Sequence, residues 1–146
     1  GLVGSEMCIR DSRMAAYELV TGQRIWELNL AGISTPAIVG DWLFTLDDHA
    51  EILAIARTSG KVRWLTQLSR YHNAKKRKGP IFWVGPVLAG NKLWIGNSRG
   101  ELGTVDPGTG VFSKYLDLKD PISLAPVVAN QTLYVLDDSG LISAYR

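Results

Sequence analysis

Short apolar runs separated by polar turns dominate this chain, and one such pattern occurs three times. Each copy begins with a proline and three apolar residues, continues through a polar pair into a second apolar run, and ends in Asp-Asp or Asn-Ser. The copies occupy residues 36–48, 86–98 and 126–138, a spacing of 50 and then 40 residues. A repeat of about 40 residues built from short strands is typical of β-propellers, in which each repeat packs against its neighbours.

The best-preserved repeat divides into four runs with the character of β-strands. We expect these strands at residues 35–39, 42–46, 51–56 and 62–68. Runs rich in Val, Ile, Leu and Trp and bounded by Gly, Asp, Asn and Ser indicate strands joined by hairpins. No segment shows a sustained helical period. The pattern therefore predicts an all-β fold, a β-propeller of four-stranded antiparallel blades.

A second motif, Thr or Ser followed by Gly, accompanies each repeat at residues 21–26, 59–64 and 109–114. The glycine permits the positive φ of a tight hairpin. In the first two copies a tryptophan stands four residues after the glycine, whereas the third copy has Lys114. We expect these tryptophans to pack between adjacent blades. The residues assigned to the repeat framework are Gly22, Trp26, Pro36, Gly60, Trp64, Pro86, Gly110 and Pro126.

The chain is too short for a closed ring. Its 146 residues hold about three blades, whereas a closed propeller needs at least about four. We expect an incomplete arc of a protein of about eight blades, with Arg146 as the natural C-terminus and the last blade completed by a strand from far upstream. Alone, the arc is expected to be poorly soluble or to self-associate, because its end blades expose faces that fit neighbours.

Residues 1–13 match no part of the repeat and resemble a translated sequencing adaptor. We interpret them as a non-native leader, with a natural tail as the alternative, and assign the propeller to residues 14–146. Cys8 is the only cysteine, so no internal disulfide can form. It does not suit lipid acylation, because polar or bulky residues precede it.

Basic charge is concentrated in one insertion between the first two proline copies. The net charge of +2 gives no argument for nucleic-acid binding. Arg70, Lys75, Lys76, Arg77 and Lys78 are five of the 16 basic residues, which leaves the rest of the chain at −3. The insertion is either a solvated mobile loop or a contact with anionic headgroups or an acidic protein surface.

The polar residues of the repeat favour structure over catalysis. The pairs at 47–48 and 137–138 are both Asp-Asp, and the third copy has Asn97-Ser98 at that place. Asp and Asn favour such turns because their side chains bond nearby backbone groups. The two histidines, His49 and His72, have no ligand-like partners. We therefore expect no catalytic, cofactor-binding or metal-binding residue.

Two further predictions concern tryptophans. Trp83 falls outside the repeat pattern and is the best single candidate for a surface anchor, since aromatic residues are enriched at interface hot spots. Trp42 and Trp94 lie in second strands of the repeat. We expect them to face opposite sides of their blades.

Together the two motifs resemble the quinoprotein-like (PQQ-like) propeller repeat. Within that superfamily the chain is similar to the BamB family, lipoproteins of the bacterial outer-membrane β-barrel assembly machinery. The likeness covers residues 14–146, as the last three blades, and it is carried by the stretches 85–93, 100–102, 125–128 and 143–146.

The resemblance implies a scaffold without catalytic activity or cofactor in a Gram-negative bacterium. Such a protein is lipid-anchored at the periplasmic face of the outer membrane, where it binds the barrel-inserting protein. Neither nucleic acid nor a small-molecule substrate is expected, and an anionic membrane surface is a further candidate partner. Two alternatives stay open: part of a PQQ-dependent dehydrogenase with the same repeat, and a generic periplasmic protein-binding propeller.

Overall fold

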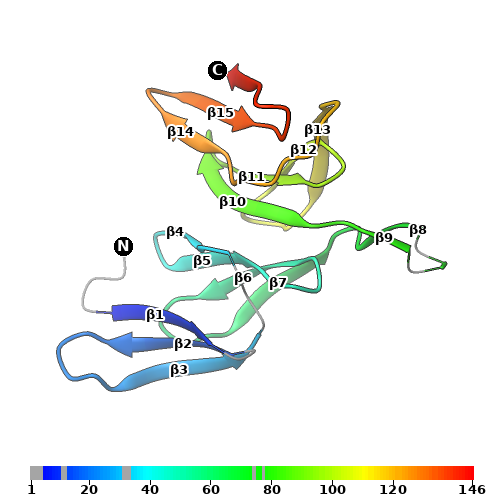
Figure 1. Ribbon diagram of the computed structural model, residues 1–146. Helices are drawn as coiled ribbons and strands as arrows, with labels where there is room; N and C mark the ends of the chain where they lie inside the picture. Colours follow the sequence, from blue (N-terminus) through cyan, green and yellow to red (C-terminus); the bar gives the residue numbers. More distant parts are fainter. Residues whose placement is uncertain (1–4, 11–12, 31–33, 74, 77) are drawn as a thin grey trace.

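The computed structural model describes residues 5–10, 13–30, 34–73, 75–76 and 78–146, with side chains from Met14 onward. Every regular element in those residues is a β-strand, and the strands form four antiparallel sheets in chain order plus one separate hairpin (Figure 1). The first sheet contains β1 (Ser5–Arg10), β2 (Arg13–Glu18) and β3 (Arg24–Asn29). The second sheet contains β4 (Ala37–Val39), β5 (Trp42–Leu46), β6 (Glu51–Ala56) and β7 (Val62–Gln67).

The other two sheets follow the hairpin. The third sheet contains β10 (Trp83–Ala89), β11 (Lys92–Asn97), β12 (Glu101–Val105) and β13 (Phe112–Asp117). The fourth sheet contains β14 (Val127–Ala129), β15 (Thr132–Leu136) and β16 (Ile142–Tyr145). The prediction of an all-β chain of small antiparallel sheets is confirmed. The expected strands 42–46 and 51–56 have the bounds of β5 and β6, while β4 begins only after Pro36, which has no N–H for the ladder.

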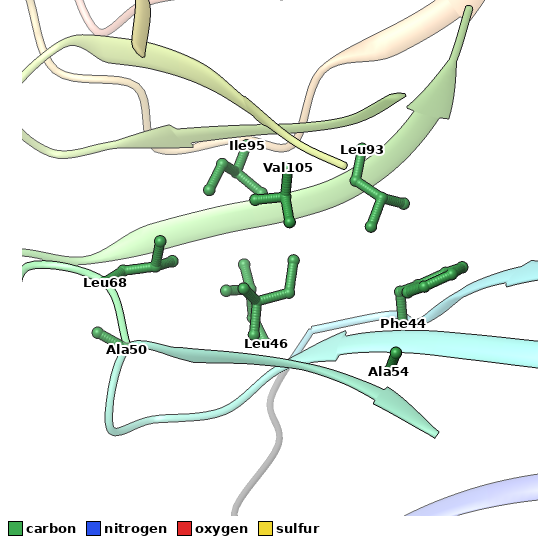
Figure 2. Packing of buried hydrophobic residues seen from close by; sticks show 9 residues of the cluster. Phe44, Leu46, Ala50, Ala54, Leu68, Leu93, Ile95 and Val105 are labelled. Carbon is green, nitrogen blue, oxygen red and sulfur yellow. The ribbon is translucent and has the colours of Figure 1, made fainter. Parts of the chain in front are cut away.

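Consecutive sheets pack face to face, and the core lies between them. We call the face that contacts the following sheet the forward face, and the opposite one the rear face. Figure 2 shows side chains of the second sheet's forward face pointing at the rear face of the third sheet. The buried residues of this junction are Phe44, Leu46, Ala50, Ile52, Ala54 and Leu68 on one side and Leu93, Ile95 and Val105 on the other.

The two other junctions repeat this arrangement. Met14, Ala16 and Trp26 of the first sheet pack against Leu43, Leu53 and Ile55 of the second. Leu102 of the third sheet packs against Leu133 and Val135 of the fourth, with Ile122 between them. Because side chains alternate between the two faces of a strand, each central strand serves both the junction before it and the junction after it.

The basic insertion is a paired hairpin. Strands β8 (Tyr71–Asn73) and β9 (Lys78–Pro80) pair through Tyr71 with Pro80 and Asn73 with Lys78. The hairpin projects from the stacked sheets at the connection between the second and third (Figure 1). Residues 71–73 and 78–80 therefore form paired strands and not the mobile loop that was one of the two expectations.

The tryptophan expectations need two corrections. Trp83 is the first residue of β10 and pairs with Asn97, because β10 extends past a register shift between Val84 and Val87. It therefore belongs to the repeat's first strand. The prediction that Trp42 and Trp94 face opposite sides is wrong. In the pairing register Trp42 corresponds to Lys92, two residues before Trp94, so both tryptophans share the forward face.

The first sheet includes a strand from the segment taken to be a leader. β1 pairs along its whole length with β2, from Ser5 opposite Glu18 to Arg10 opposite Arg13. The first sheet thus has three strands within the described part of the chain. Strand pairing does not depend on the origin of a segment, so the interpretation of residues 1–13 as non-native stays a prediction.

Candidate protein-binding site

Carboxylate and amide side chains in the repeated turns are occupied by the backbone. The Oδ1 atom of Asp47 accepts hydrogen bonds from the N–H groups of His49 and Glu51, both at 2.9 Å. Asn97 does the same for Arg99 and Glu101 at 2.9 and 3.0 Å. Asp137 accepts from Ser139 and Leu141 at 3.0 and 3.1 Å. These residues therefore fix the turn between the second and third strands of each sheet.

The turns also shift carboxyl pKa values in opposite directions. The hydrogen bond from the Ser139 hydroxyl, with the backbone N–H groups of Leu141 and Ser139, lowers the pKa of Asp137. Backbone N–H groups of Thr109 and Gly108 lower the pKa of Asp106 in the next turn of the third sheet. A side-chain hydrogen bond with Asp47, together with burial, raises the pKa of Glu51.

The tryptophans of the second motif link neighbouring sheets. Trp64 lies in β7, and its Nε1–H donates to the carbonyl of Pro107 in the third sheet at 2.9 Å. Trp26 donates in the same way to the carbonyl of Arg57 in the second sheet. Each indole lies against the glycine of the next motif copy. A Cβ at Gly110 would lie 2.7 Å from Trp64, and a Cβ at Gly60 would lie 2.8 Å from Trp26.

The junction between the third and fourth sheets lacks this link. Lys114 occupies the tryptophan position, and its ammonium lies 3.1 Å from Asp117 and 3.8 Å from Glu101, both in its own sheet. A groove of about 770 Å³ remains there, lined among others by Trp94, Lys114 and Tyr145. Tyr115 packs edge-on against both Trp94 and Tyr145, with ring centroids 5.1 and 6.0 Å apart.

A second groove lies where the first strands of successive sheets meet. β10 neighbours both β4 and β14. The groove has a volume of about 580 Å³ and is lined by residues 34–38, 83–88 and 123–125. Pro36 and Pro86, which begin two repeat copies, both contribute to it. Leu124 stands at its side with 60% of its surface exposed. We call this the inner-strand groove, and its shape and apolar lining suit a protein segment.

Trp83 connects the inner-strand groove to the basic hairpin. Its indole lines the groove, and its Nε1–H donates to the carbonyl of Ser69, immediately before the hairpin, at 2.8 Å. The ring packs edge-on against Phe112 with centroids 5.7 Å apart. Trp83 is thus half-buried, and the freely exposed aromatic residue beside it is Phe82, with 68% of its surface exposed.

The hairpin presents its cations to solvent. Lys75, Lys76 and Lys78 are exposed, and the Arg70 guanidinium lies 5.5 Å from the centre of the Tyr71 ring. Arg77, the fifth predicted cation, lies outside the described residues. The sequence did not single out Phe82 or Leu124. Only tertiary neighbours decide whether an isolated apolar residue is exposed, so no local pattern marks them.

Metal-ligating clusters and membrane-spanning helices do not occur in the described part of the chain. Among those residues, no group of three or more His, Cys, Asp or Glu side chains could hold a metal ion. The same residues contain no helix long and apolar enough to cross a membrane.

The stacked antiparallel sheets, joined in register by repeated tryptophan contacts, define the class of protein as a β-propeller. The chain belongs to the family described as "Outer membrane protein assembly factor BamB", whose model matches residues 10–110.

Individual relatives agree with this assignment. Curated BamB proteins of Alkalilimnicola ehrlichii and Salmonella typhimurium are 24% and 26% identical and cover 91% and 92% of the chain. The chain spans about a third of their length, 33% and 32%. The crystal structure of BamB from Moraxella catarrhalis is similar with a TM-score of 0.72 at 21% identity, over 97% of this chain and 42% of that one.

Proposed function

We propose that this chain is part of a non-enzymatic scaffold for the assembly of outer-membrane β-barrel proteins. It acts on the periplasmic side of the outer membrane, to which a lipid anchor attaches the full-length protein, and it binds the barrel-inserting protein of the machinery. The observation that carries the proposal is the family match over residues 10–110. The curated relatives that share the match are named as assembly factors.

The geometry supports a binding role for this part of the protein. The side chains of Asp47, Asn97 and Asp137 accept hydrogen bonds from backbone N–H groups of their turns, so they stabilise the connections between strands. The inner-strand groove is lined by residues in or next to the first strands of three sheets, and it offers apolar surface from Trp83 and Leu124. Tryptophan is enriched among the residues that carry most of the binding energy at protein interfaces, so Trp83 is the anchor that this groove offers. We place the partner contact in this groove.

A matched pair of leucines tests the proposal. Leu124 lies in the groove and Leu141 lies in the fourth sheet's turn, and each has 60% of its surface exposed. The measurement is the affinity of the chain for the purified periplasmic domains of the barrel-inserting protein. We expect Leu124→Glu to weaken binding at least about tenfold, because burying an unpaired carboxylate opposes association. Leu141→Glu is expected to bind as the parent does. No binding by the parent, or equal loss in both variants, would contradict the proposal.

A further inference from the structure

The basic hairpin carries a charge opposite to that of the remaining molecule. Residues 69–82 contain five Lys and Arg residues and no Asp or Glu. In the part of the chain that the structure describes, Arg70, Lys75, Lys76 and Lys78 form no salt bridge. The charges of the three lysines are therefore available to an external anion, whereas the charge of Arg70 also acts on Glu51. Because the rest of the chain has a net charge of −3, a negatively charged surface attracts the hairpin and repels the body, which orients the molecule.

The hairpin is also shaped to reach a surface. It projects beyond the stacked sheets, so its turn can meet a flat layer before any sheet does (Figure 1). Pairing of β8 with β9 keeps the two arms together. Gly79, with φ of 70°, lies so close to His72 that a Cβ there would be 2.9 Å from the His72 Cβ. Lys78 is thus held on a paired strand, and Arg70 immediately precedes the other strand of the hairpin.

An exposed aromatic residue follows the hairpin two positions after β9. Phe82 exposes 68% of its surface although its backbone is fixed: its N–H donates to the Ser98 hydroxyl at 3.0 Å, and its carbonyl accepts from the Ser98 N–H at 2.9 Å. Tyr71 contributes a second ring beneath Arg70. Aromatic rings next to cations favour the interface between lipid headgroups and acyl chains, where the apolar body and the charge are both accommodated.

We propose that this hairpin, with Phe82, is a membrane-surface contact that binds the phosphate groups of anionic lipid headgroups. The inference rests on charge, projection and exposure, and it holds whether or not the inner-strand groove binds the barrel-inserting protein. Lipid phosphates are the source that the chemistry favours. Lysine ammonium groups are point charges without the fixed fork by which arginine matches one carboxylate. Side chains at successive positions point in different directions, and a fluid headgroup layer can surround them all.

An acidic protein surface fits these observations less well. A rigid protein partner meets one face of a hairpin at a time, and buried cations in such an interface normally lie in a shaped recess. Neither the inner-strand groove nor the groove between the third and fourth sheets contains a hairpin cation. Arg70, Lys75, Lys76 and Lys78 are exposed.

Vesicle binding of the 146-residue chain tests the inference. The probes are phosphatidylcholine vesicles with and without a minor fraction of phosphatidylglycerol, and the measurement is the partition coefficient from co-sedimentation. We expect binding only to the anionic vesicles, weakening as salt is raised. The hairpin variant combines Arg70→Gln, Lys75→Gln, Lys76→Gln and Lys78→Gln. Its partition coefficient is expected to fall at least about a hundredfold, since each cation near such a surface contributes about fivefold.

A charge-matched control separates the hairpin from net charge. Lys61, Lys92, Lys119 and Arg146 are exposed and lie outside the hairpin, so their joint change to Gln removes the same charge. This control is expected to retain most of the binding. Phe82→Ala is expected to lose about tenfold and Phe82→Trp to retain binding, because an aromatic ring remains at the interface.

Three outcomes would overturn the inference. The first is equal vesicle binding by the hairpin variant and the charge-matched control. The second is binding to vesicles of phosphatidylcholine alone that equals binding to anionic ones. The third is capture of the chain by soluble polyglutamate without capture by anionic vesicles, which would assign the hairpin to an acidic protein. If a variant folds poorly, the effect of salt on vesicle binding by the unaltered chain still tests the inference. None of these results bears on the affinity for the barrel-inserting protein.

Discussion

At the scale of single residues, the junctions depend on a tryptophan that meets a glycine. Trp64 covers Gly110, and Trp26 covers Gly60. The indole N–H of each tryptophan finds a backbone carbonyl of the next sheet. A buried indole without such an acceptor would lose much of the free energy that its burial contributes. The glycine is required twice, for a positive φ and for the absence of a side chain.

The chain supplies its own control for separating these two requirements. Gly22 and Gly110 have φ of 72° and 79°, but a Cβ would meet a neighbour within 4 Å only at Gly110. We expect Gly22→Ala to lower the free energy of unfolding by about 1 kcal/mol, from the backbone alone. Gly110→Ala is expected to cost about 2 kcal/mol more, because the methyl group displaces Trp64. Urea unfolding measures both, and equal losses would show that the indole contact is not tight.

The sequence reveals such framework residues better than it reveals surface ones. Gly60 and Trp64 were found because the motif repeats, and a repeat marks whatever every sheet needs. Phe82 and Leu124 occur once each, and their exposure depends on which segments happen not to cover them. Trp83 was singled out for falling outside the pattern, although a register shift in β10 brings it into the sheet. A shift of that kind leaves no signal in hydrophobic spacing.

At the scale of elements, the turn between the second and third strands is the most repeated unit. Three sheets use the same pair of backbone N–H groups with Asp47, Asn97 or Asp137 as acceptor. The strands on either side, β5 and β6, were predicted with correct bounds because their turn residues are explicit. The hairpin β8–β9 was not predicted, since three-residue strands with polar side chains lack the apolar alternation by which strands are recognised.

One turn contains two carboxyl groups, and this gives a pH test. The contact with Asp47 raises the pKa of Glu51 above its ordinary value of 4.5. The folded state therefore binds this proton more tightly than the unfolded chain does, so its contribution to stability is present below 4.5 and is lost as pH rises through the raised pKa. Glu51→Gln removes the titrating group, so the variant does not lose this stability as pH rises. We expect the variant to be more stable than the parent at neutral pH, with the gain vanishing in acid.

Thermal unfolding of parent and variant across this pH range is the measurement. Glu101→Gln is the control, because Glu101 holds the same turn position but faces the uncharged Asn97 and pairs with Arg99 and Lys114, so this substitution is expected to give no gain in stability at neutral pH. The lowered pKa values of Asp106 and Asp137 act in the opposite sense: they stabilise the fold at neutral pH and this is lost in acid. Both aspartates are present in the parent and in the variant, so the difference in stability between the two proteins reports on Glu51 alone. A gain that persists in acid would contradict the assigned cause.

At the scale of the whole molecule, the fourth sheet presents a forward face that no sheet covers in the described chain. Phe44, Leu46 and Ile52 on the second sheet's forward face are 2%, 2% and 0% exposed. The residues in the same repeat positions of the fourth sheet are 38%, 39% and 65% exposed, and they are Tyr134, Leu136 and Ile142. The forward faces of the first, second and third sheets are each covered by the rear face of the following sheet.

This exposed face predicts concentration-dependent self-association of the 146-residue chain. Covering Ile142 would remove apolar surface from water, and we expect Ile142→Asp to weaken association about thirtyfold, measured by sedimentation velocity. Leu141→Glu is the matched control: Leu141 is exposed too, and the second and third sheets have Glu51 and Glu101 at that position. A parent chain that stays monomeric at high concentration would refute the prediction.

The presence of Lys114 in place of a tryptophan also bears on which junction between sheets separates first under a mechanical load. The first two junctions are fastened across the gap by indole hydrogen bonds, to Arg57 and to Pro107, whereas the ammonium of Lys114 lies beside acids of its own sheet. A load that separates the first sheet from the fourth is transmitted through all three junctions in series. We expect the joint between the third and fourth sheets, which lacks such a hydrogen bond, to yield first, so that the first three sheets then bear the load together.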